Sequence, residues 1–180
     1  YIQQLEEAIM RCISRFGIEG EANTKVGHIR TYMEVDFAST TSSFWRLRHA
    51  YAEWNYFKIG HTWSTFMDNA SLPTTVEFEG PNSSLSKRHG LIRYERKYGE
   101  QSIVGVSIEA PVSDYFNPAD SLLEGKNKQG NFDIAGRYKH LQKWGHVQLA
   151  GIFRRIDYLN DDHIDELYGW GILLSSVYKL

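Results

Sequence analysis

The chain has 180 residues, and its 20 Lys and Arg residues nearly balance its 22 Asp and Glu residues. This balance gives no electrostatic footprint for nucleic acid, so we expect no nucleic-acid partner. The single cysteine, Cys12, excludes an internal disulfide framework and a Cys-rich metal site. No apolar run reaches the roughly eighteen residues of a membrane helix, but membrane-spanning strands alternate and keep the mean hydropathy low, at −0.45 here.

Residues 1–12 have the pattern of a short amphipathic helix. Ile2, Leu5, Ile9 and Cys12 recur at helical spacing, with Gln and Glu residues between them. Fewer than two heptads are marginally stable on their own. Two alternatives stay open, a helix that pairs with other helices and a frayed helix without a partner.

The remainder of the chain, 13–180, is dominated by polar and apolar side chains that alternate, as in HIRTYMEVDF at 28–37. A period of two predicts strands with one wet face and one apolar face, and hence an all-β, antiparallel fold. Most of the predicted strands are close to the length that crosses a bilayer at a tilt. We predict about nine strands, at 13–21, 27–37, 45–54, 56–63, 90–97, 101–110, 132–141, 145–156 and 168–180.

The connections between these strands alternate between short and long. Short turns follow the first, third, fifth and seventh strands, whereas the long connections are 38–44, 64–89, 111–131 and 157–167. Short turns at one rim and long loops at the other are typical of an outer-membrane barrel. The sequence therefore predicts a porin-like transmembrane β-barrel segment, and the alternative is a soluble β-barrel or β-sheet module that binds anionic small ligands.

The polar face of the predicted strands is rich in charge. So many charges are too costly to bury in a small dry barrel, which favours a water-filled lumen. Strict alternation places His49, Tyr51 and Glu53 on the opposite, lipid-facing side, where His49 and Glu53 fit poorly. The cations expected on the polar face are Arg15, Arg30, Arg46, Arg48, Lys58, Arg93, Arg137, Lys139 and Arg154, and the acids among them are Glu19, Glu34, Asp36, Glu95, Glu109 and Asp133.

Catalytic and metal-binding patterns are weak. His61, Ser64 and Asp68 lie close together in HTWSTFMD, but no GxSxG elbow surrounds the serine. The acidic stretch DDHIDE at 161–166 has oxygen ligands for a divalent cation, but a solvated surface loop is the favoured interpretation. We expect no enzyme activity, no cofactor and no structural metal.

Several blocks carry a family resemblance. SRFGIEGEANTKVGHIRTYMEVDF, FWRLRHAYAEWNYFKIGHTWSTFMD, LPTTVEFEGPNSSLSKRHGLIRYE and WGHVQLAGIFRRI, in this order, resemble successive strands of the DcaP-like outer-membrane porins of Gram-negative bacteria. The resemblance implies a homotrimer of barrels with about sixteen strands each, embedded in outer-membrane lipid and lipopolysaccharide. It also implies passive diffusion of small anionic solutes, dicarboxylates among them.

Carried onto this chain, the resemblance implies that a segment at about 64–89 folds into the pore as a constriction loop. Asp68, Glu77 and Glu79 on that loop would then face a basic, anion-binding pore lining made of Arg30, Arg46, Arg48, Lys58, Arg93, Arg137 and Arg154. The family has a strand before the SRFG block and continues beyond the last residue of this chain. We therefore expect 13–180 to be about half of a barrel. The resemblance makes a remnant of the family's coiled-coil extension one interpretation of 1–12, and a frayed helix without a partner stays the alternative.

Overall fold

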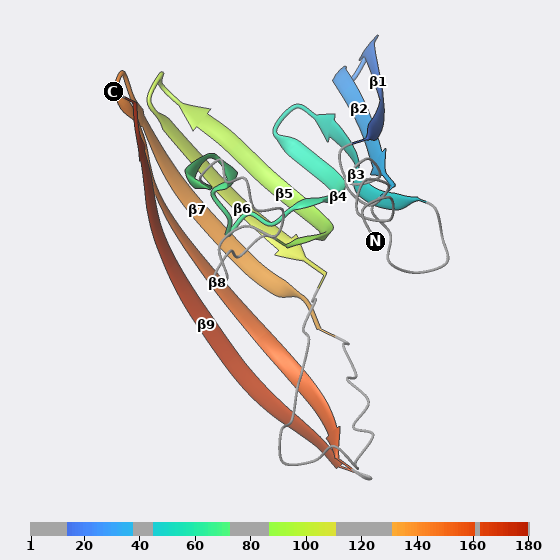
Figure 1. The fold of residues 1–180 in the computed structure, drawn as a ribbon, viewed down its shortest axis with the longest axis vertical. Helices are drawn as coiled ribbons and strands as arrows, with labels where there is room; N and C mark the ends of the chain where they lie inside the picture. Colours follow the sequence, from blue (N-terminus) through green and yellow to red (C-terminus); the bar gives the residue numbers. More distant parts are fainter. Residues whose placement is uncertain (1–13, 38–44, 73–86, 111–130, 161–162, 180) are drawn as a thin grey trace, which may run out of the picture.

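The computed structural model describes residues 14–37, 45–72, 87–110, 131–160 and 163–179, and these form a single antiparallel sheet of nine strands in chain order (Figure 1). This confirms the predicted all-β, antiparallel fold, whereas the helix expected at 1–12 lies outside the described residues. The strands are β1 (Arg15–Thr24), β2 (Gly27–Asp36), β3 (Arg46–Trp54), β4 (Phe57–Trp63), β5 (Arg88–Tyr98), β6 (Ser102–Glu109), β7 (Asp133–Gln142), β8 (Gly145–Asn160) and β9 (His163–Tyr178).

Two rims bound the sheet. The turn rim holds the tight connections 25–26, 55–56, 99–101 and 143–144, and the loop rim holds the opposite strand ends, such as Asp36, Glu109 and Asp133. The loop predicted at 157–167 is wrong, because β8 and β9 stay paired as far as Asn160 and His163. Opposite charges on facing strands explain this, since Arg155 donates to Glu166 (2.5 Å) and such pairs stabilise a ladder.

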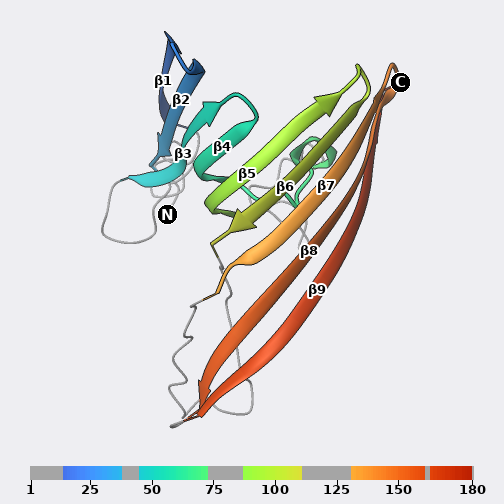
Figure 2. The ribbon, with the colours of Figure 1, turned by 180° about the vertical axis from the view of Figure 1, so that it is seen from behind.

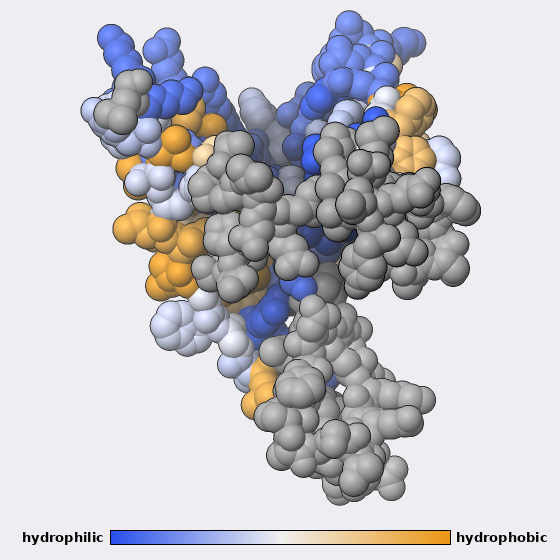
Figure 3. Space-filling view, viewed as in Figure 1, coloured by the Kyte–Doolittle hydropathy of each residue, from blue (hydrophilic) through white to orange (hydrophobic). Residues whose placement is uncertain are grey.

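The outer, convex face of the sheet carries a continuous apolar row. Directly paired residues build it across six strands, from Ile59 through Ile92, Ile108, Ile134 and Phe153 to Trp170. These side chains are all exposed in the isolated chain. Figure 3 shows such residues gathered on both flanks, below a hydrophilic turn rim. An exposed apolar band of this extent suits lipid contact.

A β-bulge in β3 corrects the predicted orientation of three residues. The register between β2 and β3 shifts at Glu34/Val35, so that Leu47 lies opposite Val35 but His49 lies opposite Glu34. The extra residue reverses the alternation. His49, Tyr51 and Glu53 therefore lie on the inner face together with Arg46 and Arg48, and the lipid-facing orientation expected for them is wrong.

Gly60 of β4 is required by the close approach of β3. Its φ is +136°, and a Cβ atom there would lie 2.2 Å from the Ala50 carbonyl oxygen. Only glycine adopts this conformation without strain. Gly60 pairs with Tyr51, so the aromatic side chain covers the gap that the glycine leaves on the inner face.

The sheet is bent into a trough, and a chain segment lies on its concave side (Figures 1 and 2). This inward segment, 64–72, contains a single 3-10 turn, η1 (Asn69–Ser71), and follows β4. No helix among the described residues is long and apolar enough to cross a membrane.

Candidate pore wall and inward segment

The inward segment is attached to the sheet at its beginning by Glu109. The Ser64 hydroxyl donates to one carboxylate oxygen of Glu109 (2.6 Å), and the Thr65 backbone N–H donates to the other (2.7 Å). Ser107 Oγ (2.6 Å) and His89 Nε2 (2.7 Å) complete the set. A fully buried carboxylate with four donors is the arrangement that offsets the cost of burying its charge.

Asp68 provides a second attachment site further along the segment. Its carboxylate accepts hydrogen bonds from Lys139 Nζ (2.9 Å), His146 Nε2 (2.7 Å) and Ser175 Oγ (2.8 Å), which lie on β7, β8 and β9. Burial by itself raises the pKa of Asp68, but these three hydrogen bonds outweigh it and lower the pKa to about 2. The segment therefore crosses from β4 to the far side of the sheet and stays ionically fixed there.

Between these two attachment sites, polar groups of the sheet bind the segment directly. Arg93 Nε donates to Thr65 Oγ1 (2.6 Å), and Gln148 Nε2 donates to the Met67 carbonyl oxygen (3.0 Å). Arg93, Gln148 and Met67 are all buried. The segment is thus packed as a fixed element against the inner face of the sheet.

This packing assigns positions to the residues expected on the constriction loop. Asp68 lies on the inner face, but its carboxylate is turned into the wall and its side chain is only 1% exposed. It is placed to anchor the segment, and it does not present a negative charge to the lumen. Glu77 and Glu79 lie outside the described residues.

The basic residues predicted for the pore lining lie on the inner face, and nearly all of them pair with carboxylates. Arg46 makes a bidentate contact with Asp36 (3.0 and 2.7 Å), and Arg48 bridges Glu34 and Asp36 (2.8 Å each). Both arginines lie side by side at the loop rim because the bulge of β3 falls between Leu47 and His49.

The remaining cations pair with acids on the adjacent strand, except Arg137, which reaches Glu95 across β6. Glu53 accepts hydrogen bonds from Arg30 (2.9 Å) and forms an ion pair with Lys58 (2.7 Å). Arg30 also pairs with Glu19, Arg137 with Glu95 and Arg154 with Asp133. Arg93 differs from these, since it lies buried beneath Thr65, where it supports the inward segment and does not face open solvent.

Sequence reasoning missed the residues that hold the segment in place. Glu109 was expected only as one acid on the polar face, and His89, His146, Gln148 and Ser175 were not singled out. The contact between Ser64 and Glu109 joins residues 45 positions apart and that between Asp68 and Ser175 joins residues 107 positions apart, which no local pattern reveals. The sequence offered one signal for Glu109, namely an acidic residue at the end of an otherwise apolar and small-residue strand, QSIVGVSIEA.

The hydrogen bonds also argue against the catalytic arrangement. Ser64 Oγ donates to Glu109, and Asp68 is bound by His146, so His61, Ser64 and Asp68 do not form a relay. Among the residues that the structure describes, no group of three or more His, Cys, Asp and Glu side chains is arranged to hold a metal ion. Asp161 and Asp162 of the acidic stretch lie outside these residues.

A curved antiparallel sheet with an apolar outer face, a charged inner face and a segment fixed across its inside is the wall of a membrane-spanning β-barrel. Residues 5–163 match the sequence model of the family described as Porin subfamily, and the chain belongs to this porin family. Membership assigns it to the bacterial outer membrane. No curated protein matches.

One solved structure is similar in fold, the crystal structure of the outer membrane channel DcaP of Acinetobacter baumannii. The TM-score is 0.81 at 23% sequence identity, and the match covers 93% of this chain and 47% of that chain. The chain therefore spans about half the length of the solved channel. The porin resemblance found in the sequence is confirmed.

Proposed function

We propose that the protein contributes the wall of a water-filled channel for passive diffusion of small anionic solutes, such as dicarboxylates. The observation that carries this proposal is the layering of charge at the loop rim. There the side chain of Asp36 is fully buried, while the side chain of Arg46, which pairs with it, is 44% exposed. Arg154 and Asp133 repeat the arrangement.

This layering favours anions although the inner face carries both signs of charge. A solute in the lumen meets the exposed cations at close range and the buried carboxylates only behind them. At a distance of about 4 Å a unit charge in water is worth about 1 kcal/mol, and the effect falls steeply with distance and salt. Arginine also matches carboxylates with two parallel hydrogen bonds, which suits a dicarboxylate passing Arg46 and Arg48.

The assembly belongs to the same proposal. We propose a homotrimer in outer-membrane lipid and lipopolysaccharide, without enzyme activity, and support comes from the porin family and the apolar outer row. The soluble binding module is less well supported, because it would leave this row in water. A detergent-solubilised trimer that dissociates only on heating is the expected result in gel electrophoresis.

The selectivity is tested with the double variant Arg46→Ala and Arg48→Ala in planar bilayers. Reversal potentials under a salt gradient report the ratio of anion to cation permeability. We expect the ratio to fall by up to about fivefold, since about 1 kcal/mol of attraction is lost near the ion path. Asp36 and Glu34 would then lose their ion pairs with these two arginines, which adds to the change.

Arg96→Ala is the matched control. Arg96 lies over the rings of Tyr56 and Tyr98 at the turn rim, on the outer face of β5 by register. Its removal should leave the permeability ratio unchanged. Equal ratios for the double variant and the control would rule out the anion-selective wall.

A further inference from the structure

The exposure of inner-face carboxylates differs between the two ends of the pore wall. At the loop rim Asp36 and Asp133 are 0% exposed, and Glu109 is also fully buried. Glu34, the next acid inward, has a side chain that is only 14% exposed. Among the described residues, this half of the wall therefore offers a solute exposed cations and almost no accessible negative charge.

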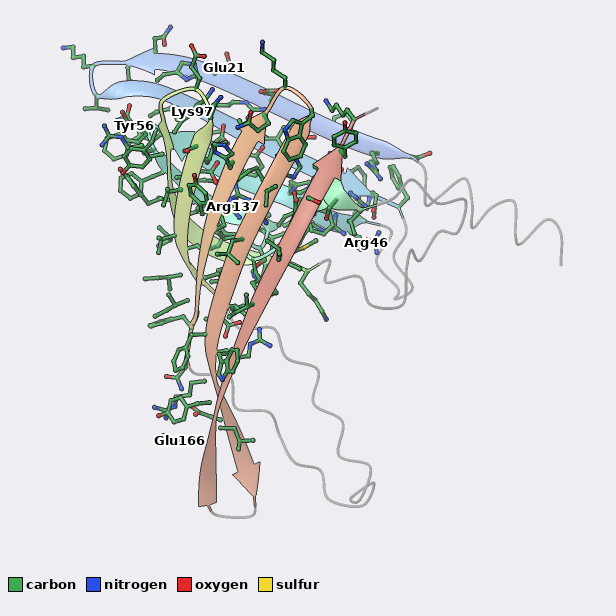
Figure 4. All side chains as sticks on the ribbon, turned by 90° about the vertical axis from the view of Figure 1, so that its left-hand side faces the viewer. Glu21, Arg46, Tyr56, Lys97, Arg137 and Glu166 are labelled. Atoms are coloured by element: carbon green, nitrogen blue, oxygen red, sulfur yellow. The ribbon has the colours of Figure 1, made fainter. Side chains whose placement is uncertain are left out.

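Toward the turn rim the acids are as accessible as the cations. The side chains of Glu19, Glu53 and Glu95 are 45%, 29% and 34% exposed, next to Arg30 at 32% and Arg137 at 16%. Glu53 and Glu95 lie on interior strands of the sheet, so their exposure does not arise from a free sheet edge. Figure 4 shows where labelled residues lie between the two rims, with Glu21 near the turn rim, Arg137 between the rims and Arg46 toward the loop rim.

We infer that the lumen is polarised along its axis, with an anion-selecting half at the loop rim and a half of mixed charge at the turn rim. The inference rests on the proposed channel function and adds that the two ends of the channel differ in their selection for anions. Selection for anions takes place where solutes enter from the loop rim, and solutes that approach from the turn rim first meet both signs of charge.

The physical consequence is rectification of the ionic current. The wall spans a hydrocarbon layer of about 30 Å, whereas the Debye length is about 10 Å in 0.1 M salt, so the two halves act on ions separately. When the turn side is positive, anions enter through the basic half at the loop rim and move toward the turn side. Cations enter through the mixed half and are held back where the basic half begins. Both kinds of ion therefore accumulate in the lumen, and the current is larger than at the opposite voltage.

The experiment compares currents at equal positive and negative voltages for the protein oriented in planar bilayers. In about 0.1 M KCl we expect a current ratio clearly different from one, with the larger current when the turn side is positive. In about 1 M KCl, where the Debye length falls to about 3 Å, the ratio should approach one. An open channel with a ratio of one in both salts overturns the axial polarity but not the channel, whereas the absence of any conductance overturns the proposed function itself.

The variant that tests the origin of the effect is Glu19→Gln with Glu95→Gln. It removes two exposed acids from the turn half, which makes the wall more uniformly basic, so the current ratio should move toward one while anion selectivity rises. Glu166→Gln is the matched control, because Glu166 is also 45% exposed and also pairs with an arginine, but lies on the outer face of β9 by register. A ratio that is unchanged in the double variant, or changed equally in the control, contradicts the inference.

Discussion

The inner face of the sheet has two regions that share one sequence pattern and differ in environment. In the covered region, on β5 to β8, Gln148, Ser107 and Arg93 are almost completely buried. In the open region, on β1 to β4, Arg30 and Lys58 are partly exposed, although they alternate with apolar neighbours in the same way. The difference arises from the inward segment, which packs directly on Arg93 and Gln148 of the first region.

The comparison shows that a polar residue on a barrel wall acquires its role from what covers it. Under the inward segment, polar groups are dry and each must find a partner, so they become structural. On the open wall, Arg30 and Lys58 remain partly accessible to water and solutes. Buried Arg93 and exposed Arg46 illustrate the two outcomes for one residue type.

The largest effect is expected from removing the first attachment of the segment. In Glu109→Gln the charge is lost and the new amide faces four donors, of which Ser64 and Thr65 belong to the segment itself. Loss of one partner of a buried ionic set costs about 3–5 kcal/mol. We expect a lower free energy of unfolding and release of the segment, which makes Met67 accessible.

Thiol labelling of a Met67→Cys variant in a Cys12→Ser background measures this accessibility. Labelling should be slow in the parent and much faster with Glu109→Gln. Asp133→Asn is the matched control, because Asp133 is equally buried but forms its ion pair with Arg154 of β8. Equal labelling rates in both variants would falsify the anchoring role of Glu109.

An intermediate effect is expected from Asp68, whose loss frees only the far end of the segment. Its pKa of about 2 lies below the ordinary value of 3.8, so the ionised form is the one stabilised by folding. The stabilisation is present above about pH 4 and is lost as the pH falls toward 2. Single-channel conductance should therefore rise over this interval in the parent protein.

The variant Asp68→Asn separates this step from other titrations. It should show the higher conductance already at neutral pH and lack the additional change between about pH 4 and 2. Its effect should be smaller than that of Glu109→Gln, because the fully buried Glu109 still holds Ser64 and Thr65 at the beginning of the segment. Parallel pH profiles in parent and variant would show that Asp68 does not hold the segment.

The outer face of the molecule was predictable from sequence because its signal is local. Alternation alone identified Ile92, Ile108 and Ile134 as one face, and their strands align directly in the structure. Two local rules failed at identifiable points. The bulge in β3 reversed the alternation after Leu47. The polar stretch at 157–167 resembled a loop, although β8 and β9 stay paired within it as far as Asn160 and His163.

The inner face was only half predictable. Parity placed Arg30, Arg46 and Arg137 correctly on it, but their partners and their accessibility depend on neighbouring strands and on the inward segment. The hydrogen bond between Ser175 and Asp68 joins residues that are 107 positions apart in the sequence. No periodicity contains information at that separation, so the anchoring role of Asp68 follows from the structure alone.

The smallest effect is expected for an acid of the open region, Glu53→Gln. Glu53 pairs with both Arg30 and Lys58, but all three side chains are partly exposed, and such pairs contribute about 0–1 kcal/mol. We expect little change in the free energy of unfolding and slow labelling at Met67→Cys, as in the parent. A loss as large as that of Glu109→Gln would mean that ion pairs on the open wall are as structural as those beneath the segment, and coverage would no longer distinguish the two regions.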